Sequence, residues 1–333
     1  MGSEPLFVVF GAPAGFQAAV GGTQLARLQQ AHLRVQVELI QDHERFAAAL
    51  PEADGAIVFV DFAALLGPAL GPGGRLRWIQ SITAGVNHLL TPELLAAEHV
   101  ALSSTKGPMG PLMAEHIVML MLALARDLPG FLRDQADRRW RFLSDERPMI
   151  DLWGRTVAIL GVGSVGGSLA RICKLGFGMR VLGMARTRRD DPYVDRYFER
   201  ADLRAALAEA DFVALTLALT PETERIIDAA ALASMKTGAY LVNVSRGELV
   251  DEAALLAALR EGRIGGAGLD SVLDEPLPPE SPLSSAPNLI VTPHVSPGRD
   301  RFGAEVIEFW CENIRRFAEG EPLLGEVDRA AGY

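Results

Sequence analysis

Short apolar runs alternate with segments of helical periodicity along most of the chain. In the N-terminal part, apolar runs of strand length are separated by helical patterns such as residues 24–30 and 46–50. Strand-length runs separated by helix-length segments predict parallel β-α-β units. The strands predicted in this part are residues 6–10, 35–40, 56–60, 78–82 and 100–103.

A long helix and a second α/β segment are predicted to follow. Apolar residues recur at helical spacing from Leu112 to Arg133, which predicts one continuous helix that could join two domains. Beyond Leu152 the alternation of strands and helices starts again, with the number of strands that a full doubly wound sheet requires. The predicted strands are residues 157–160, 181–184, 212–217, 240–244, 268–272 and 289–292.

The last helical pattern, residues 302–317, stands alone near the end of the chain. A single amphipathic helix cannot bury its own apolar face, so it must pack on one of the preceding domains. At about 150 residues per domain, a chain of 333 residues also suggests two domains. We therefore predict an α/β fold with two Rossmann-like or flavodoxin-like domains, each built on a doubly wound parallel sheet.

Charge and cysteine content exclude several kinds of partner. The 32 Lys and Arg residues against 42 Asp and Glu residues give a net charge of −10, which argues against a nucleic-acid surface. No apolar run approaches the ~20 residues that span a bilayer, so we expect no membrane association. Cys173 and Cys311 are the only cysteines, so we expect no disulfide framework, no metal site and a reducing, cytoplasmic location.

A G-x-G-x-x-G motif follows the predicted strand 157–160 and opens a helical pattern. In this context the first glycine permits a tight turn, the second lets the backbone approach a pyrophosphate, and the third permits close contact between helix and strand. The N-terminus of the helix would then receive the anion. The predicted cofactor-binding residues of this motif are Gly161, Gly163, Ser164, Val165 and Gly166.

The end of the next predicted strand bears on the choice between NAD and NADP. An acidic residue usually holds the ribose 2′-hydroxyl there, but this chain has Ala185 followed by a basic run. Guanidinium groups can bind a 2′-phosphate, so the run favours NADP, with NAD as the alternative cofactor. The alternative interpretation is a solvated basic loop. The residues predicted to contact the cofactor here are Arg186, Thr187 and Arg188.

Three polar residues follow the ends of predicted strands, where ligands bind in open α/β sheets. Arg246, Glu275 and His294 each come just after such a strand. Arg offers a planar fork for a carboxylate, His exchanges a proton near neutral pH, and Glu can orient and charge the His. Each residue alone has a structural explanation, but together in a dinucleotide-binding domain they predict a catalytic site.

Around these motifs, the sequence from Trp153 to His294 resembles the D-isomer-specific 2-hydroxyacid dehydrogenase family. The resemblance covers about residues 75–300, whereas the first 70 residues match in pattern only. The matching blocks are residues 154–157, 219–223, 235–239, 243–255, 269–278 and 291–294, with 83–88, 114–116 and 123–126 before them.

The resemblance implies an Arg–Glu–His catalytic set, which Arg246, Glu275 and His294 match. Arg246 would bind the carboxylate of a 2-oxo acid and polarise its carbonyl. His294 would protonate the carbonyl oxygen while hydride adds to the carbonyl carbon, and Glu275 would hold the imidazole in its protonated form. Asp270 would lie near the nicotinamide amide.

The resemblance also implies a discontinuous substrate-binding domain, residues 1–103 with 295–333, and a dinucleotide-binding domain, residues 104–294. The active site would lie in the cleft between these domains. The loop after the predicted strand 78–82 would bind the substrate, because its glycine turn can present backbone N–H groups to a carboxylate. Its residues are Thr83, Ala84, Gly85 and Val86.

An arm from Arg133 to Phe142 carries many charges and two aromatic residues, Trp140 and Phe142. Alone it is typical of a solvated helix face. In the family that the chain resembles, such an extension packs across a two-fold dimer, so we expect a homodimer with the aromatic residues as anchors. Glu115 and His116 look like a catalytic pair, but we interpret Glu115 as a packing or cleft-edge residue.

The predicted activity is NADP-preferring reduction of small 2-oxo acids, with glyoxylate and hydroxypyruvate as the leading candidates, to D-2-hydroxy acids. One alternative is a cofactor-sensing, corepressor-like binding protein. Another is a dehydrogenase of a larger or phosphorylated 2-hydroxy acid, which would call for a basic cluster in the N-terminal domain. Arg75 and Arg77 are the candidates for that cluster, and we expect both to face water.

Overall fold

The chain folds around two parallel sheets in the computed structural model. The structure describes all residues except 1–4, 17–20, 141–148, 188–189 and 299–301. One unit consists of Met1–Met109 with Arg299–Tyr333, and the other consists of Gly110–Gly298. The divisions of the chain therefore fall after Met109 and Gly298, later than the predicted boundaries after residues 103 and 294.

The first unit is built on a five-stranded sheet with the order β2-β1-β3-β4-β5. All neighbouring strands pair in parallel, and the order is the one found in flavodoxin-like folds. The strands are β1 (Leu6–Gly11), β2 (Val35–Ile40), β3 (Gly55–Val58), β4 (Trp78–Ser81) and β5 (Ala101–Ser103).

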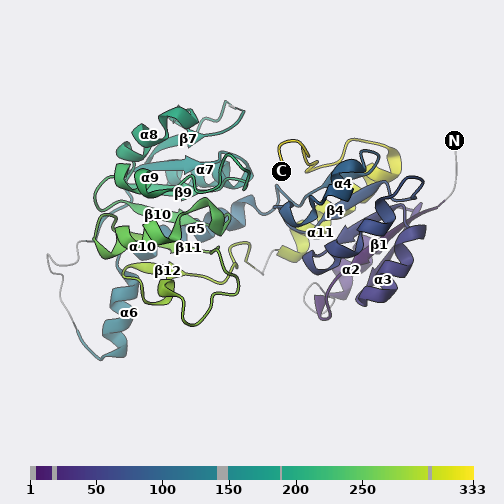
Figure 1. Cartoon of the computed structure of the whole chain (residues 1–333), viewed down its shortest axis with the longest axis horizontal. Helices are drawn as coiled ribbons and strands as arrows, with labels where there is room; N and C mark the ends of the chain where they lie inside the picture. The colour runs from purple at the N-terminus through teal and green to yellow at the C-terminus, as the bar shows by residue number, and fades with distance from the viewer. Residues whose placement is uncertain (1–4, 17–20, 141–148, 188–189, 299–301) are drawn as a thin grey trace. The chain divides into compact units, whose positions relative to one another are not determined.

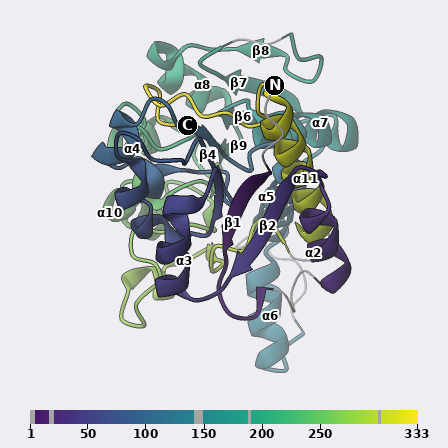
Figure 2. The ribbon, with the colours of Figure 1, turned by 90° about the vertical axis from the view of Figure 1, so that its right-hand side faces the viewer.

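Successive side chains of a strand point to opposite faces of the sheet, and apolar residues occupy both faces here. Helices therefore cover both faces of this sheet. In β1, Val9 belongs to the core cluster that includes Phe46 of α3. The ring of Phe10 instead packs edge to face on Trp310 of α11, with 5.4 Å between the ring centroids. Figures 1 and 2 show α2 and α11 beside each other, in line with the ion pair between their residues Arg27 and Glu308. The helices are α2 (Gly22–Gln29), α3 (His43–Ala49), α4 (Pro92–Ala96) and α11 (Phe302–Glu319), with 3-10 turns η1 (Leu50–Glu52), η2 (Val60–Leu65), η3 (Gly67–Leu70) and η4 (Asn87–Leu89).

Buried polar groups attach α11 to the first sheet. Trp310 Nε1 donates to Thr105 Oγ1 at 2.9 Å, and Asn313 Nδ2 donates to Gln80 Oε1 at 2.7 Å. Asn313 also donates to the carbonyl oxygen of Leu324 and accepts from its N–H, at 3.0 and 2.8 Å. The solitary helix predicted at residues 302–317 thus packs on the unit that contains the N-terminal sheet.

The second unit is built on a seven-stranded parallel sheet with the order β12-β11-β10-β9-β6-β7-β8. This is the Rossmann order with one further strand, so the predicted fold class is confirmed in both units. The prediction missed β8, which is too short to give a periodic pattern. The strands are β6 (Thr156–Leu160), β7 (Arg180–Met184), β8 (Arg196–Tyr197), β9 (Phe212–Leu215), β10 (Tyr240–Asn243), β11 (Gly266–Leu269) and β12 (Leu289–Val291).

Two core clusters cover the two faces of the second sheet. In β6, Ala158 and Leu160 belong to the cluster formed with α8, α9 and α10, and Val157 and Ile159 belong to the one formed with α5 and α7. Such alternation is expected of a sheet that is buried on both faces. The helices are α5 (Gly110–Ala125), α6 (Leu128–Ala136), α7 (Ser164–Phe177), α8 (Leu203–Glu209), α9 (Ala229–Ser234) and α10 (Glu252–Arg260), with 3-10 turns η5 (Arg200–Asp202), η6 (Gly247–Leu249) and η7 (Pro282–Ser285).

The predicted continuous helix from Leu112 to Arg133 is wrong, because the structure contains two helices there. Asp127 adopts a left-handed conformation with φ 49°, which ends the run of α5, and its side chain accepts a hydrogen bond from Gly130 N as the N-cap of α6. Pro129 occupies the first turn of α6, where a missing N–H costs little. Periodicity of apolar residues alone did not reveal this break.

Replacing Asn313 with Leu is expected to destabilise the first unit. The change removes the buried amide that bonds Gln80 Oε1 and both backbone groups of the half-buried Leu324, so the free energy of unfolding falls by about 2 kcal/mol. Urea denaturation followed by tryptophan fluorescence measures the loss. Glu308→Gln on the same helix is the control, because its exposed ion pair contributes less than about 1 kcal/mol. Equal unfolding midpoints for the two variants would contradict the assignment.

Candidate active site

The turn between β6 and α7 is packed so closely that it requires glycine. Gly161 has φ 107°, and a Cβ atom there would lie 2.6 Å from the carbonyl oxygen of Thr216. A Cβ atom on Gly166 would lie 2.2 Å from the carbonyl oxygen of Gly161. Thr216 Oγ1 also donates to that oxygen at 2.7 Å. The turn therefore sits between β6 and β9, where the strand order of the sheet reverses and nucleotides commonly bind.

Gly163 differs from the other two glycines of the motif because it borders open space. No heavy atom lies within 4 Å of the position that its Cβ would take. Gly163 is the N-cap of α7 and provides no side-chain oxygen to the first turn, which begins with Ser164 and Val165. An uncapped helix N-terminus with room in front of it attracts an anion. These residues therefore fit the pyrophosphate of a dinucleotide.

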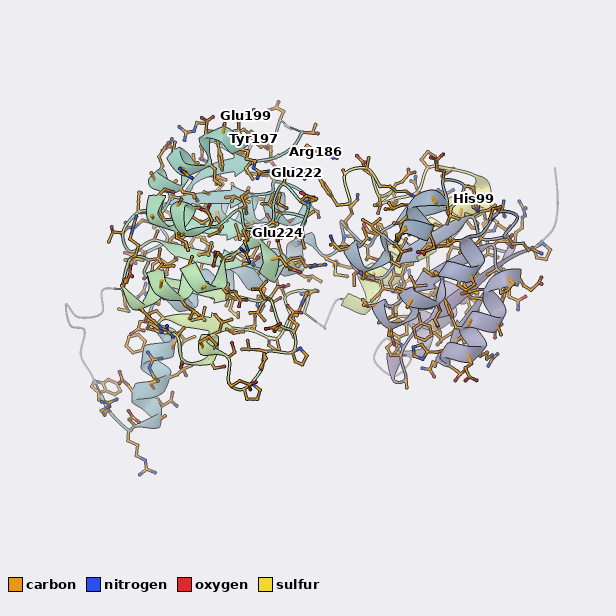
Figure 3. The ribbon with its side chains drawn as sticks, in the orientation of Figure 1. His99, Arg186, Tyr197, Glu199, Glu222 and Glu224 are labelled. Carbon is orange, nitrogen blue, oxygen red and sulfur yellow. The ribbon has the colours of Figure 1, made fainter. Side chains whose placement is uncertain are left out.

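The loop after β7 contains the residues predicted to bind a 2′-phosphate. Arg186 and Thr187 follow the buried end of the strand, and both are exposed; Arg186 is labelled in Figure 3. Arg188 lies outside the described residues. The described part of the loop thus presents a guanidinium and a hydroxyl at the carboxyl end of β7.

The same loop also contains acidic residues that the sequence analysis did not consider. Asp191 Oδ2 lies 3.5 Å from the position that a Cβ on Gly167 would take, so this carboxylate faces the first turns of α7. Its Oδ1 accepts a hydrogen bond from Tyr193 N at 2.9 Å. A cavity of about 400 Å³ lies between residues 190–193 and α7. The carboxylate follows the basic run, and only the folded loop brings it toward the helix.

His294 and Glu275 form a hydrogen-bonded pair. His294 Nδ1 lies 2.8 Å from Glu275 Oε2, and Glu275 Oε1 accepts from Val272 N at 3.1 Å. His294 has φ 51°, a left-handed conformation that is uncommon for residues other than glycine, and its N–H donates to the carbonyl oxygen of Asp270 at 3.0 Å. Because Nδ1 faces a carboxylate, Nε2 is the nitrogen left to exchange a proton with a ligand.

Arg246 lies just beyond β10, where backbone contacts hold its loop. Asn243 Nδ2 donates to the carbonyl oxygen of Arg246 at 2.8 Å, and one guanidinium nitrogen donates to the carbonyl oxygen of Ser245 at 2.7 Å. Burial lowers the pKa of Arg246, and the charges of Glu248 and Glu275 oppose that effect. The guanidinium therefore lies within electrostatic range of the Glu275 carboxylate.

Gly247 explains how the loops after β10 and β11 come together. A Cβ atom on Gly247 would lie 2.2 Å from the backbone of Val272, so only glycine permits this approach. Arg246 precedes this contact on one loop, and Glu275 follows it on the other. With the hydrogen bond to His294, the second unit thus gathers all three predicted catalytic side chains at the carboxyl ends of β10, β11 and β12.

Asp270 anchors the loop that carries His294. Its Oδ1 accepts from Thr292 Oγ1 at 2.6 Å and from Val295 N at 2.9 Å, and its Oδ2 accepts from Ser296 N at 2.9 Å. Burial by itself would raise the pKa of Asp270, but these hydrogen bonds outweigh it and the pKa lies below its usual value. The predicted role beside the nicotinamide stays a prediction, whereas the bonds within the loop are observed.

Sequence reasoning missed a contact between His116 and this anchor. His116 Nε2 lies 3.0 Å from Thr292 Oγ1 and 3.5 Å from Asp270 Oδ1, whereas Glu115 is exposed. Burial lowers the pKa of His116, and the charge of Asp270 offsets only part of that effect. The available signal was that His116 and Glu115 are the only ionisable residues in the otherwise apolar segment 110–125.

The predicted substrate loop lies in the first unit, directly after β4. Thr83 Oγ1 donates to the carbonyl oxygen of Gly85 at 2.7 Å and lies 2.9 Å from Ser81 Oγ. Within the part of the chain that the structure describes, the N–H groups of Ala84, Gly85 and Val86 donate to no other group. Adjacent N–H groups of this kind can bind an anion.

Arg75 and Arg77 lie at the amino ends of the strands of the first sheet, opposite the end that carries the predicted substrate loop. Both guanidinium groups pair with the buried Asp54, at 3.3 and 3.2 Å, and Asp54 also accepts from Phe7 N at 2.9 Å. Asp54 and Arg77 precede β3 and β4, so this cluster marks the amino ends of the strands. It does not supply a basic group to the loop at residues 83–86, which follows the carboxyl end of β4.

Comparison with known proteins shows which family the chain belongs to. A sequence model described as "D-isomer specific 2-hydroxyacid dehydrogenase, NAD binding domain" matches residues 118–296. The chain belongs to this family. It is 34% identical to a glyoxylate reductase from Korarchaeum cryptofilum over 74% of each chain. It is also 34% identical to glyoxylate/hydroxypyruvate reductase B from Serratia proteamaculans, over 76% of this chain and 78% of that protein.

Solved structures of the family share the whole architecture. One is an NADPH-dependent glyoxylate/hydroxypyruvate reductase from Sinorhizobium meliloti, solved in complex with NADP and sulfate. It superimposes with a TM-score of 0.82 at 29% identity and covers 99% of this chain and 100% of its own. The resemblance found in the sequence is therefore confirmed, and the chain is a D-isomer specific 2-hydroxyacid dehydrogenase family member with a nicotinamide dinucleotide-binding unit.

The arm predicted from Arg133 to Phe142 is described only in part. Figure 1 shows α6 extending away from the sheet of its own unit, and Trp140 is 88% exposed. Arg141 and Phe142 lie outside the described residues. The α6 side chains that leave large apolar surface in solvent are Leu128, Phe131 and Leu132. The predicted homodimer stays a prediction.

Among the described residues, no group of His, Cys, Asp and Glu side chains has an arrangement that could hold a metal ion. In the same residues, no helix combines the length and the apolar composition needed to span a membrane. Burial raises the pKa of Cys173 to about 12 and that of Cys311 to about 11, so neither thiol is ionised at neutral pH.

Replacing Gly163 with Ala is expected to weaken NADPH binding without destabilising the protein. The new methyl group meets no protein atom, but it occupies the space in front of the α7 N-terminus. We expect the dissociation constant for NADPH, measured by fluorescence titration, to rise about tenfold or more while the melting temperature stays constant. Gly176→Ala, later in the same helix and equally unobstructed, is the matched control. Equal NADPH binding by both variants would contradict the assignment.

Proposed function

We propose that this dehydrogenase reduces small 2-oxo acids, such as glyoxylate and hydroxypyruvate, to D-2-hydroxy acids. The observation that carries the proposal is the hydrogen bond between His294 and Glu275 within electrostatic range of Arg246. These side chains follow adjacent strands of the sheet that also presents the glycine turn at its switch point. Reductases of glyoxylate and hydroxypyruvate among the relatives support the substrate class.

Each catalytic residue has a role that follows from its charge. Arg246 binds the substrate carboxylate through its planar fork and stabilises the negative charge that develops on the carbonyl oxygen. A reduced nicotinamide dinucleotide supplies the hydride when it is bound. His294 donates its Nε2 proton to the carbonyl oxygen, and Glu275 orients the ring through Nδ1 and stabilises the imidazolium. In the oxidative direction, His294 accepts the proton.

We assign the substrate loop of the first unit to carboxylate binding. The N–H groups of Ala84, Gly85 and Val86 have no acceptor among the described residues, and an anionic substrate would provide one. Thr83 shapes this loop through its hydrogen bond to Gly85. A neutral ketone would leave these groups without a charged partner, so the loop favours 2-oxo acids.

We propose NADP as the preferred cofactor and NAD as the alternative. Gly161, Gly163 and Gly166, with Ser164 and Val165 in the first turn of α7, would hold the pyrophosphate. The residues assigned to the 2′-phosphate are Arg186, Thr187 and Arg188, and Asp270 is assigned to the nicotinamide amide. The preference is supported by the exposed Arg186 at the end of β7 and by the NADPH-dependent relative from Sinorhizobium meliloti.

Two alternatives receive less support from the site. A protein that only senses the cofactor has no use for a His–Glu pair within electrostatic range of an arginine, so the catalytic set favours an enzyme. A phosphorylated substrate needs a basic cluster near the substrate loop. Arg75 and Arg77 instead pair with Asp54 at the amino ends of the strands.

We also propose that the enzyme is a cytoplasmic homodimer. Its two cysteines are free thiols, which suits a reducing compartment. The exposed apolar side chains of α6 and Trp140 suit burial against a second copy. The arm from Arg133 to Phe142 is therefore assigned to the dimer interface.

The variant His294→Asn is expected to lose reduction of glyoxylate and hydroxypyruvate and to retain NADPH binding. Asn cannot donate and recover a proton at this position, so kcat falls by at least about a hundredfold. NADPH oxidation is followed by absorbance at saturating substrate, and the dissociation constant for NADPH comes from fluorescence titration. His99→Asn, at an exposed position, is the control. Turnover comparable to that of the wild type would refute the assignment of His294 as the acid.

Replacing Arg186 with Ala is expected to change cofactor preference. The variant loses a guanidinium that can pair with a 2′-phosphate, so the KM for NADPH rises about tenfold while the KM for NADH changes by less than about twofold. Initial rates with both cofactors at a fixed 2-oxo acid concentration measure the effect. The control is Arg260→Ala, which removes an exposed guanidinium from the end of α10. Equal effects on both cofactors would mean that Arg186 is only a solvated residue.

A further inference from the structure

His116 links the helix α5 to the loop that carries the proposed acid. Its Nε2 lies 3.0 Å from Thr292 Oγ1 and 3.5 Å from Asp270 Oδ1. Helix α5 covers one face of the second sheet, so its position is fixed by a buried core. A contact from this helix therefore connects the loop after β12 to an element that is packed into the core of its unit.

Which group donates in each hydrogen bond follows from which of Asp270, Thr292 and His116 carries a proton. Asp270 is ionised, so the hydroxyl of Thr292 must donate to it in the 2.6 Å contact. The Thr292 oxygen then has only acceptor capacity left toward His116. His116 must therefore carry a proton on Nε2 and donate it, and its half-buried position favours the neutral ring.

The hydrogen bonds of Asp270 hold the residues on both sides of His294. Thr292 precedes His294, and Val295 and Ser296, whose N–H groups donate to Asp270, follow it. The N–H of His294 itself donates to the backbone carbonyl of Asp270 at 3.0 Å. These contacts hold His294 at φ 51°, a conformation that the chain does not keep without support.

We propose that His116 is a positioning residue that, through Thr292 and Asp270, sets the placement of His294 for proton transfer. The role rests on the proposed function in which His294 is the acid. Among the described residues, the polar contacts of His116 are with Thr292 and Asp270 and not with Glu275 or His294. His116 therefore acts by restricting the rotation of the Thr292 hydroxyl. Without this donor the hydroxyl can turn away from Asp270, which loosens the loop at the proposed acid.

The test uses the full-length protein with variants at both ends of the bond. His116→Leu removes the donor, and His116→Gln restores an N–H group at nearly the same distance from the backbone. Thr292→Val removes the hydroxyl that connects His116 to Asp270, and the double variant His116→Leu/Thr292→Val completes a cycle. His99→Leu, an exposed His-to-Leu change, is the matched control.

The first readout is steady-state reduction of glyoxylate or hydroxypyruvate. We expect His116→Leu to lower kcat about tenfold with a KM for the 2-oxo acid within about twofold of the wild type, and His116→Gln to recover most of the loss. In the Thr292→Val background, His116→Leu should cost less than about twofold more. Equal losses in the Leu and Gln variants, or multiplicative losses in the double variant, would overturn the proposal.

The second readout needs no substrate and separates this proposal from the proposed function. Hydrogen–deuterium exchange is measured on a peptide covering residues 292–298, which contains the amides of Val295 and Ser296. Faster exchange in His116→Leu than in the wild type, His116→Gln and His99→Leu supports the positioning role even if no 2-oxo acid is reduced. Unchanged exchange in His116→Leu overturns it even if the wild type is an active reductase.

Discussion

A carboxylate buried at the end of a strand must be compensated by donors, and Asp270 shows how that requirement shapes a site. Its two oxygens draw in a hydroxyl and two backbone N–H groups from the loop after β12. The loop has no regular secondary structure, so these bonds take the place of the backbone hydrogen bonds that hold a strand in a sheet. Because His294 lies between the bonded residues, the need to satisfy one buried charge determines where the imidazole stands relative to Glu275.

Close backbone approach is the second constraint on this site. Gly161, Gly166 and Gly247 each stand where a Cβ atom would lie within 2.6 Å of another residue's backbone. Gly161 approaches Thr216 just beyond β9, Gly166 approaches Gly161 within the glycine turn, and Gly247 brings the loop of Arg246 against the loop of Glu275. Gly163 is under no such steric pressure, so its lack of a side chain matters only for what occupies the space beside it.

Most of the fold was predictable from the sequence, because the alternation of strand-length and helix-length segments is a local signal. The positions of Arg246, Glu275 and His294 after strands were equally visible, since parallel strands place their carboxyl ends at one edge. Other features depend on tertiary packing. His116 and Thr292 are 176 positions apart, and no spacing rule connects a helix residue with a loop that far along the chain. The break at Asp127 was missed because apolar periodicity continues across it, although Pro129 marked the site.

The first unit is completed by the end of the chain. Helix α11 supplies Trp310 and Asn313 to the interior of that unit, and Val327 N donates to the carbonyl oxygen of Leu102 in β5. During synthesis on the ribosome, residues 1–109 therefore emerge long before their missing helix exists, whereas Gly110–Gly298 has all its strands available once residue 298 has emerged. The sheet that is synthesised first can therefore be completed only after the whole second unit has been synthesised.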